Sequence, residues 1–142
     1  MIVIYTPDMA PELVRLCKQM RDETDYKGAD FQPDQVVALA SNPAVFCALY
    51  KHLNKFVGVV AGYVSKQVFG NDIVANDLVL YVEPEGRKSR AAISLIRQFE
   101  AWAKEHGAKS VYMTSSSGML GVEKIFNRFG YDTVGVVTRK EI

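Results

Sequence analysis

The stretch 82-VEPEGRKSRAAISLIRQFEAWA-103 contains a strand end, a turn and the start of a long helix. Its apolar side chains recur at helical spacing along one face, at Ala91, Ala92, Leu95, Ile96, Phe99, Trp102 and Ala103. Gly107 is a typical helix stop. Junctions of this kind often bind phosphate, usually with glycines where the backbone meets the ligand. This turn has one glycine, Gly86, followed by three basic residues, so it is either a phosphate site or a basic helix cap.

Outward from this stretch, strand and helix patterns follow one another in the order β-α-α-β-β-β-α-β-α-β. We predict strands at residues 2–5, 44–51, 55–68, 73–82, 110–115 and 131–140, and further helices at 8–21, 33–41 and about 118–129. Hairpins make the first half antiparallel, and a βαβ crossover joins 73–82 to 110–115. Gly58 and Gly62 indicate bulges or close packing. The pattern predicts an α+β (mixed α/β) fold, a mixed, largely antiparallel sheet with helices on both faces.

Length and composition limit the class of protein. The 142 residues fit a single domain, residues 1–142. A formal net charge of +1 gives no reason to expect a nucleic-acid or membrane partner, and no apolar run reaches the roughly 20 residues that span a bilayer. The N-terminus does not have the pattern of a signal peptide. Cys17 and Cys47 match no metal or redox spacing, so we expect reduced thiols, no bound metal and a cytoplasmic location.

The chain resembles the GNAT superfamily of N-acetyltransferases over nearly its whole length, most densely from residue 72 to 140. A strand ending in V-x-P before a turn of the type R/Q-x-x-G-x-G/A is similar to 82-VEP-84 and 87-RKSRAA-92. The family's ending of an aromatic helix, G-F/Y and a final strand is similar to 125-IFNRFGYDTVG-135. Two features depart from the pattern: Arg90 replaces a turn glycine, and Phe126 stands where a tyrosine is frequent.

The resemblance implies acetyl-CoA as the cosubstrate, with its pyrophosphate on the turn before the long helix. Helix-start N–H groups have no intrahelical partner, and the helix dipole adds partial positive charge, so the backbone itself can bind phosphate. Basic side chains at this position oppose the dipole unless an anion is present, which favours a phosphate site over a solvated cap. The expected cofactor-binding residues are Arg87, Lys88, Ser89, Arg90, Ala91 and Ala92. In the family the pantetheine arm pairs with the preceding strand, at the positions of Leu80, Tyr81 and Val82.

Acetyl transfer to an amine needs a base for the ammonium proton. Asp77 is the first candidate, because the family often has an acid on this strand and strands disfavour aspartate. The alternative is that Asp77 marks an exposed segment or a bulge. Phe126 cannot protonate the leaving thiolate, so either no general acid is needed or water, Tyr112, Ser116 or Ser117 serves. Glu83 and Glu85 are expected to be exposed turn residues.

The acceptor is expected at the polar loop 22-DETDYKGAD-30, the region where family members vary most. Asp25 and Tyr26 would suit a cationic amine, on a small molecule or a peptide, through charge and cation–π contact. The alternative is an ordinary solvated acidic loop. A homodimer is common in the family, although no residue here demonstrates one.

Three functions stay open from the sequence. The first is an acetyl-CoA-dependent N-acetyltransferase. The second is a catalytically silent protein of the same fold that binds coenzyme A as a sensor or structural subunit, which Arg90 and Phe126 keep open. The third, an unrelated nucleotide-binding domain, is weakened because the chain has neither G-x-G-x-x-G nor a P-loop motif.

Overall fold

The computed structural model describes residues 1–115 and 121–142. Within them five strands form one sheet in chain order, with β1 to β4 antiparallel and β5 parallel to β4. The strands are β1 (Ile2–Ile4), β2 (Val45–His52), β3 (Lys55–Lys66), β4 (Ile73–Val82) and β5 (Ser110–Tyr112). The predicted antiparallel hairpins and the parallel β4–β5 crossover are confirmed.

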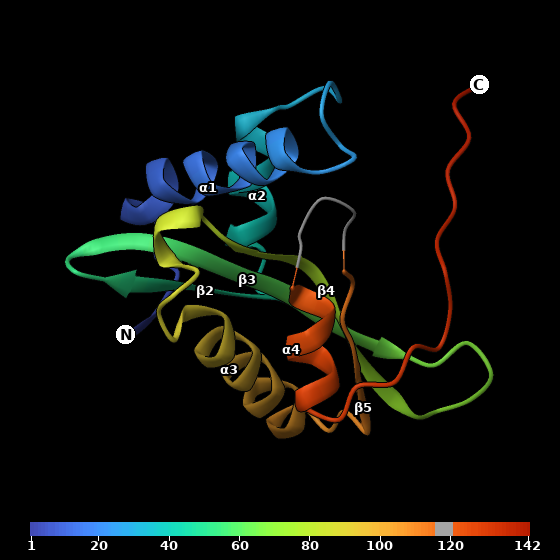
Figure 1. Ribbon diagram of the computed structural model, residues 1–142. Helices are drawn as coiled ribbons and strands as arrows, with labels where there is room; N and C mark the ends of the chain where they lie inside the picture. The colour runs from blue at the N-terminus through green and yellow to red at the C-terminus, as the bar shows by residue number, and fades with distance from the viewer. Residues whose placement is uncertain (116–120) are drawn as a thin grey trace.

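Helices cover both faces of this sheet, as predicted (Figure 1). The helices α1 (Ala10–Glu23) and α2 (Pro33–Ser41) lie on one face, and α3 (Ala91–Glu105) and α4 (Val122–Arg128) lie on the other. Each face has its own apolar core, because strand side chains alternate between the two faces. The α1 side buries Leu13, Leu16, Cys47, Leu49, Val59, Ala61 and Tyr81. The α3 side is built around Phe46, Val60, Leu80, Leu95, Ile96, Phe99 and Phe126.

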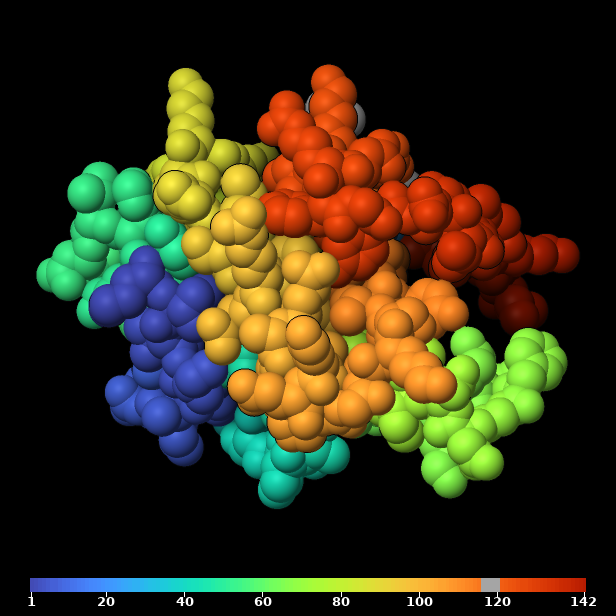
Figure 2. All heavy atoms as spheres, turned by 90° about the horizontal axis from the view of Figure 1, so that it is seen from below, coloured from blue at the N-terminus to red at the C-terminus, as the bar shows by residue number. Residues whose placement is uncertain are grey.

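Two glycines of β3 let α3 pack directly on the strand backbone. A Cβ added to Gly62 would lie 2.4 Å from the Phe99 ring and 2.6 Å from the carbonyl oxygen of Asn76. A Cβ on Gly58 would lie 2.9 Å from the Leu95 side chain. The predicted close packing is therefore confirmed. Figure 2 shows α3 along the middle of this face of the molecule, between the N-terminal residues and the C-terminal part of the chain.

β4 contains a bulge and then separates from β5. Ala61 pairs with Val79 and Gly62 pairs with Asp77, so Leu78 is an extra residue on β4. The β4–β5 pairing is short, from Val74↔Ser110 to Asn76↔Tyr112, and among the described residues it goes no further. The last part of β4 is therefore bonded to β3 on one side and open on the other.

The predicted strand at residues 131–140 is wrong for the single chain. This segment forms no strand within the described residues, and it runs away from the body of the molecule (Figure 1). Val134, Val136 and Val137 are 76%, 86% and 90% exposed. The residue types favour a strand, but a strand also needs a partner edge, and none of the described strands is paired with this segment.

Candidate active site

The open side of β4 presents backbone groups to the gap beside β5. The N–H of Glu83 donates to the carbonyl of Val57 on β3 at 2.8 Å. Because backbone groups alternate along a strand, Tyr81 also faces β3, whereas Leu80 and Val82 face the gap. The Val82 carbonyl accepts from Nε of Arg87 at 3.0 Å. Of the three residues expected to pair with pantetheine, two thus have backbone groups on the open side.

The turn after β4 leaves helix-start N–H groups without protein partners. Ser89 Oγ donates to the Gly86 carbonyl at 2.5 Å and accepts from the N–H of Ala91 at 3.1 Å. Within residues 1–115 and 121–142, four other backbone N–H groups here have no acceptor, those of Lys88, Arg90, Ala92 and Ile93. Such groups, at the positive end of a 15-residue helix, form an anion-binding surface.

The single glycine of this turn serves packing. A Cβ on Gly86 would lie 2.7 Å from the Val57 side chain and 3.0 Å from that of Val82. Gly86 is buried, so its missing side chain lets the turn lie against β3 and β4. The one glycine of the turn is thus explained by packing. The lack of further glycines does not remove the backbone N–H groups that could bind an anion.

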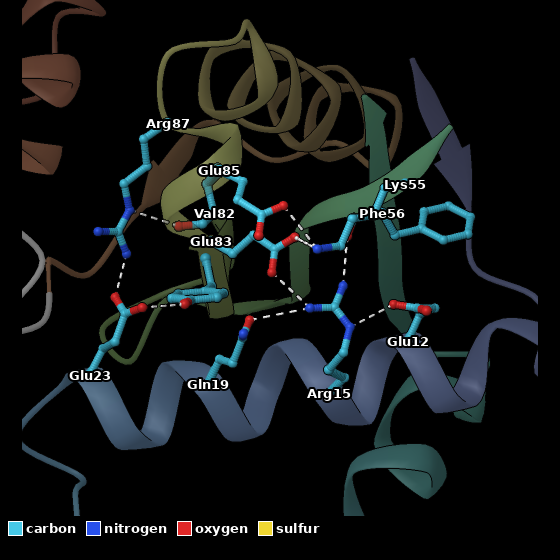
Figure 3. Close-up of polar contacts among 11 residues, drawn as sticks. Glu12, Arg15, Gln19, Glu23, Lys55, Phe56, Val82, Glu83, Glu85 and Arg87 are labelled. Atoms are coloured by element: carbon cyan, nitrogen blue, oxygen red, sulfur yellow. Dashed lines mark hydrogen bonds and ion pairs between the residues drawn. The ribbon is translucent and has the colours of Figure 1, made fainter. Parts of the chain in front are cut away.

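The three basic residues of the turn differ in their contacts. Arg87 donates to the Val82 carbonyl, forms an ion pair with Glu23 at the end of α1, and lies over the ring of Tyr81 (Figure 3). The Tyr81 hydroxyl donates to the same Glu23 carboxylate at 2.7 Å. Lys88 and Arg90 are exposed, and no carboxylate of the described residues pairs with either. Only these two are free to meet an anion without losing an internal contact.

Glu83 is buried, which overturns the expectation of an exposed turn residue. It is 2% exposed, and its carboxylate lies 2.7 Å from Nη1 of Arg15 and 3.4 Å from Nζ of Lys55 (Figure 3). Arg15 also donates to the Phe56 carbonyl at 2.7 Å. The ion pairs tie α1 and β3 to the first residue after β4. Sequence reasoning missed them because the partners lie far from Glu83 in the chain. Glu85, in contrast, is exposed as predicted and pairs with Lys55.

Asp77 lies beside the last β4–β5 pair, where the two strands separate. Its Oδ2 accepts from the backbone N–H of Thr114 at 3.1 Å. Its strand partner Gly62 points toward Phe99, so Asp77 projects from the α3 face of the sheet. No cation among the described residues pairs with it, and burial raises its pKa from the ordinary value of an aspartate. A raised pKa makes a carboxylate a stronger base.

The residues expected to contact the acceptor lie after α1, in the polar loop. Tyr26 is 51% exposed, and the Asp25 carbonyl accepts from Nη1 of Arg139 at 2.9 Å. No hydrogen bond or ion pair of the described residues joins either side chain to Asp77. A hollow of about 580 Å³ lies between α1 and the same loop, lined by Val14, Lys18, Arg21, Gly28, Ala29, Asp30, Phe31 and Pro33. This hollow contains none of the predicted site residues.

The candidates for a general acid have different surroundings. Phe126 is buried in the core, 5.4 Å from the ring of Tyr131, so its role is in packing. The Tyr112 hydroxyl accepts from Gln67 at 3.2 Å. Ser116 and Ser117 lie outside the described residues. Sequence reasoning passed over Tyr131, whose hydroxyl donates to Glu100 at 3.1 Å and whose pKa is raised by burial.

Cys17 and Cys47 are unpaired thiols, and burial raises their pKa values to about 11 and about 12. Such thiols are poor nucleophiles at neutral pH. In the part of the chain that the structure describes, no group of three His, Cys, Asp or Glu side chains is placed to bind a metal. No helix of those residues is long and apolar enough to cross a membrane.

Solved structures with the same fold include several acetyltransferases. An aminoglycoside acetyltransferase from an uncultured soil metagenomic sample is 14% identical with a TM-score of 0.75, covering 100% of this chain and 97% of that one. Ribosomal-protein-alanine N-acetyltransferase from Brucella melitensis biovar Abortus 2308 is 15% identical with a TM-score of 0.77, covering 99% of each chain. A transcriptional regulator from Bacillus halodurans C-125 is 11% identical with a TM-score of 0.82, covering 100% and 99%.

At these identities the likeness of the structures establishes the fold. Among curated proteins, no sequence matches the chain. The model of the acetyltransferase (GNAT) family matches residues 10–131, which include the separating strands, the turn and α3. The chain therefore belongs to the GNAT acetyltransferase family and is an acyltransferase.

Proposed function

We propose that this protein is an N-acetyltransferase that moves the acetyl group of acetyl-CoA to an amine acceptor while both are bound. The observation that carries the proposal is the combination of an open β4 edge with the unpaired helix-start N–H groups of α3. At the open edge of β4, an extended ligand arm can bond to the backbone N–H and carbonyl groups that would otherwise pair with a neighbouring strand. The helix-start N–H groups of α3 can donate hydrogen bonds to an anion. One ligand with a pyrophosphate and an amide-containing arm uses both.

The residues of the turn fit the phosphate end of this cosubstrate. The backbone N–H groups of Lys88, Arg90 and Ala92 would donate to phosphate oxygens, and Ser89 and Ala91 hold the turn in shape. The side chains of Lys88 and Arg90 are exposed and free to add charge. We assign Arg87 to holding the turn and the Val82 carbonyl, because its guanidinium is already bonded there and to Glu23.

The open edge of β4 would pair with the arm of the cosubstrate. Leu80 and Val82 would bond its amides through their backbone groups, whereas Tyr81 supports the strand from the α1 core. From Val82 to Asp77 the strand rises about 15–17 Å, so an extended arm that starts at the turn leads toward Asp77. Acetyl-CoA supplies the thioester from which the acetyl group leaves.

Asp77 would accept the proton of the acceptor amine, directly or through water. Its carboxylate is oriented by the Thr114 N–H, and its raised pKa improves it as a base. Binding both reactants in one site aligns the amine with the acetyl group, an effect that can contribute several kcal/mol to lowering the barrier. Since Phe126 is a core residue, we propose that the coenzyme A thiolate leaves without a protein acid. An ordinary thiol has a pKa of about 8.5, so a thiolate is a fair leaving group near neutral pH.

The acceptor would approach the loop that carries Asp25 and Tyr26. Carboxylates and an exposed aromatic ring attract a cationic amine. Two structural neighbours are named as acetyltransferases of aminoglycosides and of ribosomal-protein alanine, which supports a cationic small molecule or a peptide amine as the acceptor. We further propose one domain over residues 1–142, a cytoplasmic location consistent with two unpaired thiols, and a homodimer.

The test measures release of free coenzyme A thiol from acetyl-CoA across a panel of aminoglycosides, polyamines and N-terminal peptides. We expect release above the hydrolysis background with at least one cationic amine. Binding of coenzyme A is measured in parallel by calorimetry. Binding with no release for any amine would favour the silent, coenzyme-A-binding alternative. No binding at all would overturn both functions.

A further inference from the structure

One end of the sheet lies beyond the helices on the α1 side. The apolar core of this side includes Ala61 of β3 and stops before Tyr63, which is 37% exposed. The β3–β4 hairpin extends past both α1 and α2 (Figure 1). Val64, Ala75 and Val111 belong to the α3-side core, so their strand neighbours point to the opposite face. The strand registers place these side chains on that face: Tyr63, Ser65, Gln67, Asn76 and Tyr112.

A hollow of about 350 Å³ lies at this end of the sheet. Asn76 and Tyr112 line it, and they form the last β4–β5 pair before the two strands separate. The proposed base, Asp77, directly follows Asn76 in β4. A thioester bound along the open edge of β4 would therefore end close to the hollow.

The polar groups of the hollow are neutral and partly free. Nδ2 of Asn76 donates to Oγ of Ser65 at 3.2 Å, and Nε2 of Gln67 donates to the Tyr112 hydroxyl at 3.2 Å. Both bonds orient side chains of the hollow. Among the described residues, the amide oxygen of Asn76 and the hydroxyl hydrogens of Ser65 and Tyr112 have no partner. The hollow thus offers a ligand both donors and acceptors.

We propose that this hollow binds the body of the amine acceptor, and that the acceptor is a single hydroxylated ring with one amine, a monoamino sugar by class. The inference rests on the proposed acetyl transfer. The free groups of Ser65, Asn76 and Tyr112 would bond ring hydroxyls, and the Tyr112 ring would pack on the C–H groups of the ligand.

Size and charge favour one ring with one amine over a larger polycation. The volume is at the small end of the roughly 300–1,000 Å³ found for ligand sites, which suits one ring better than three. Lys66 lines the hollow, and none of the described residues adds a carboxylate to the lining. A second positive charge on the ligand would therefore be repelled. The acidic loop with Asp25 and Tyr26 would attract the single amine, and the sheet would hold the ring.

The first test maps glucosamine binding on the isotope-labelled protein by NMR, with coenzyme A present. We expect saturable shifts at the amides of Ser65, Gln67, Asn76 and Tyr112. Cyclohexylamine, which has the ring and the amine but no hydroxyls, should bind at least about tenfold more weakly, because several hydrogen bonds are lost. No binding of glucosamine, shifts confined to other residues, or equal binding of the two ligands would overturn the proposal.

A matched pair of variants tests the same site. Asn76→Ala should weaken glucosamine binding about two- to tenfold, the effect of one lost hydrogen bond. Asn71→Ala is the control, because Asn71 is exposed at the hairpin turn and does not line the hollow. Equal affinities in the two variants would overturn the proposal.

The second test compares kcat/KM for glucosamine and for kanamycin, a polycation of three rings. We expect glucosamine to be preferred, and Lys66→Glu should shift the ratio toward kanamycin by about fivefold, because a repulsive charge becomes attractive. A preference for kanamycin in the wild type would overturn the inference and leave acetyl transfer standing. Glucosamine shifts in the hollow without coenzyme A release for any amine would instead retain the site and overturn the proposed function.

Discussion

Asp77 lies within β4 and Glu83 is the first residue after this strand, and the surroundings of these two carboxylates differ. Glu83 is almost fully buried and meets the cations Arg15 and Lys55. Asp77 is half-buried and has no cationic partner among residues 1–115 and 121–142, and burial raises its pKa. The contrast distinguishes Glu83, whose ion pairs stabilise the fold, from Asp77, which we propose as the base.

Asp77→Asn tests the proposed chemical role of Asp77 and has the largest expected effect. We expect kcat to fall about 10²–10⁴-fold, because the amide cannot accept a proton, with little change in coenzyme A affinity. The measurement is steady-state turnover with the best acceptor, with calorimetry for the cofactor. An unchanged kcat would remove Asp77 from the role of base. The wild-type rate should rise with pH through the raised pKa of Asp77, and the variant should lack this rise.

Glu83→Gln tests the contribution of Glu83 to the stability of the fold. Arg15 would lose a buried partner, so we expect the free energy of unfolding to fall by about 1–3 kcal/mol, toward the lower end because Arg15 is about one-third exposed. Urea unfolding followed by circular dichroism measures this. Glu85→Gln is the matched control, since Glu85 is exposed and should leave stability nearly unchanged. Equal loss in both variants would mean that burial does not distinguish Glu83.

Lys88→Ala and Arg90→Ala test the turn that follows Glu83. Each exposed charge is worth about 0.3–1 kcal/mol near a helix terminus, so we expect coenzyme A binding to weaken roughly two- to fivefold per substitution. The loss should shrink as salt rises. Lys104→Ala, in the last turn of α3, is the control. Unchanged affinity in both variants would leave the backbone N–H groups as the whole of the phosphate site.

The pH dependence of stability sharpens the comparison with the smallest effect. The pKa of Asp77 is higher in the folded protein than in the unfolded chain, so its contribution is favourable at low pH and is lost as pH rises through the folded value. Asp77→Asn carries no charge, so its stability relative to wild type should increase with pH over that window. Urea midpoints of both proteins from acidic to neutral pH measure this. A constant difference would contradict the raised pKa.

The sequence predicted what depends on local pattern. The β4 strand, the V-x-P turn and the apolar face of α3 were all visible in residue spacing, and Gly62 marked the close approach of Phe99. The burial of Glu83 was not, because its cations come from α1 and β3 and only the fold brings them together. The strand at 131–140 failed for a related reason, since composition gives a strand's tendency and pairing requires an edge.

The candidate site was predictable to a similar extent. The turn residues followed from the helix start, and the position of Asp77 followed from its place in an apolar strand. Its isolation from cations, the bulge at Leu78 and the engagement of Arg87 by Glu23 depend on contacts across the sheet. Residue order alone does not specify such contacts.

The bond from Arg87 to the Val82 carbonyl has a consequence for the order in which ligands bind. The same guanidinium holds Glu23, the last residue of α1, and the loop with Asp25 and Tyr26 starts immediately after it. A ligand amide that donates to the Val82 carbonyl, as proposed above, would compete with Arg87 for that oxygen and so would also change the contact of Arg87 with Glu23. If the proposed function is right, binding of the cosubstrate and binding of the acceptor would be coupled through this one side chain, and the effect of each on the affinity of the other would be reciprocal.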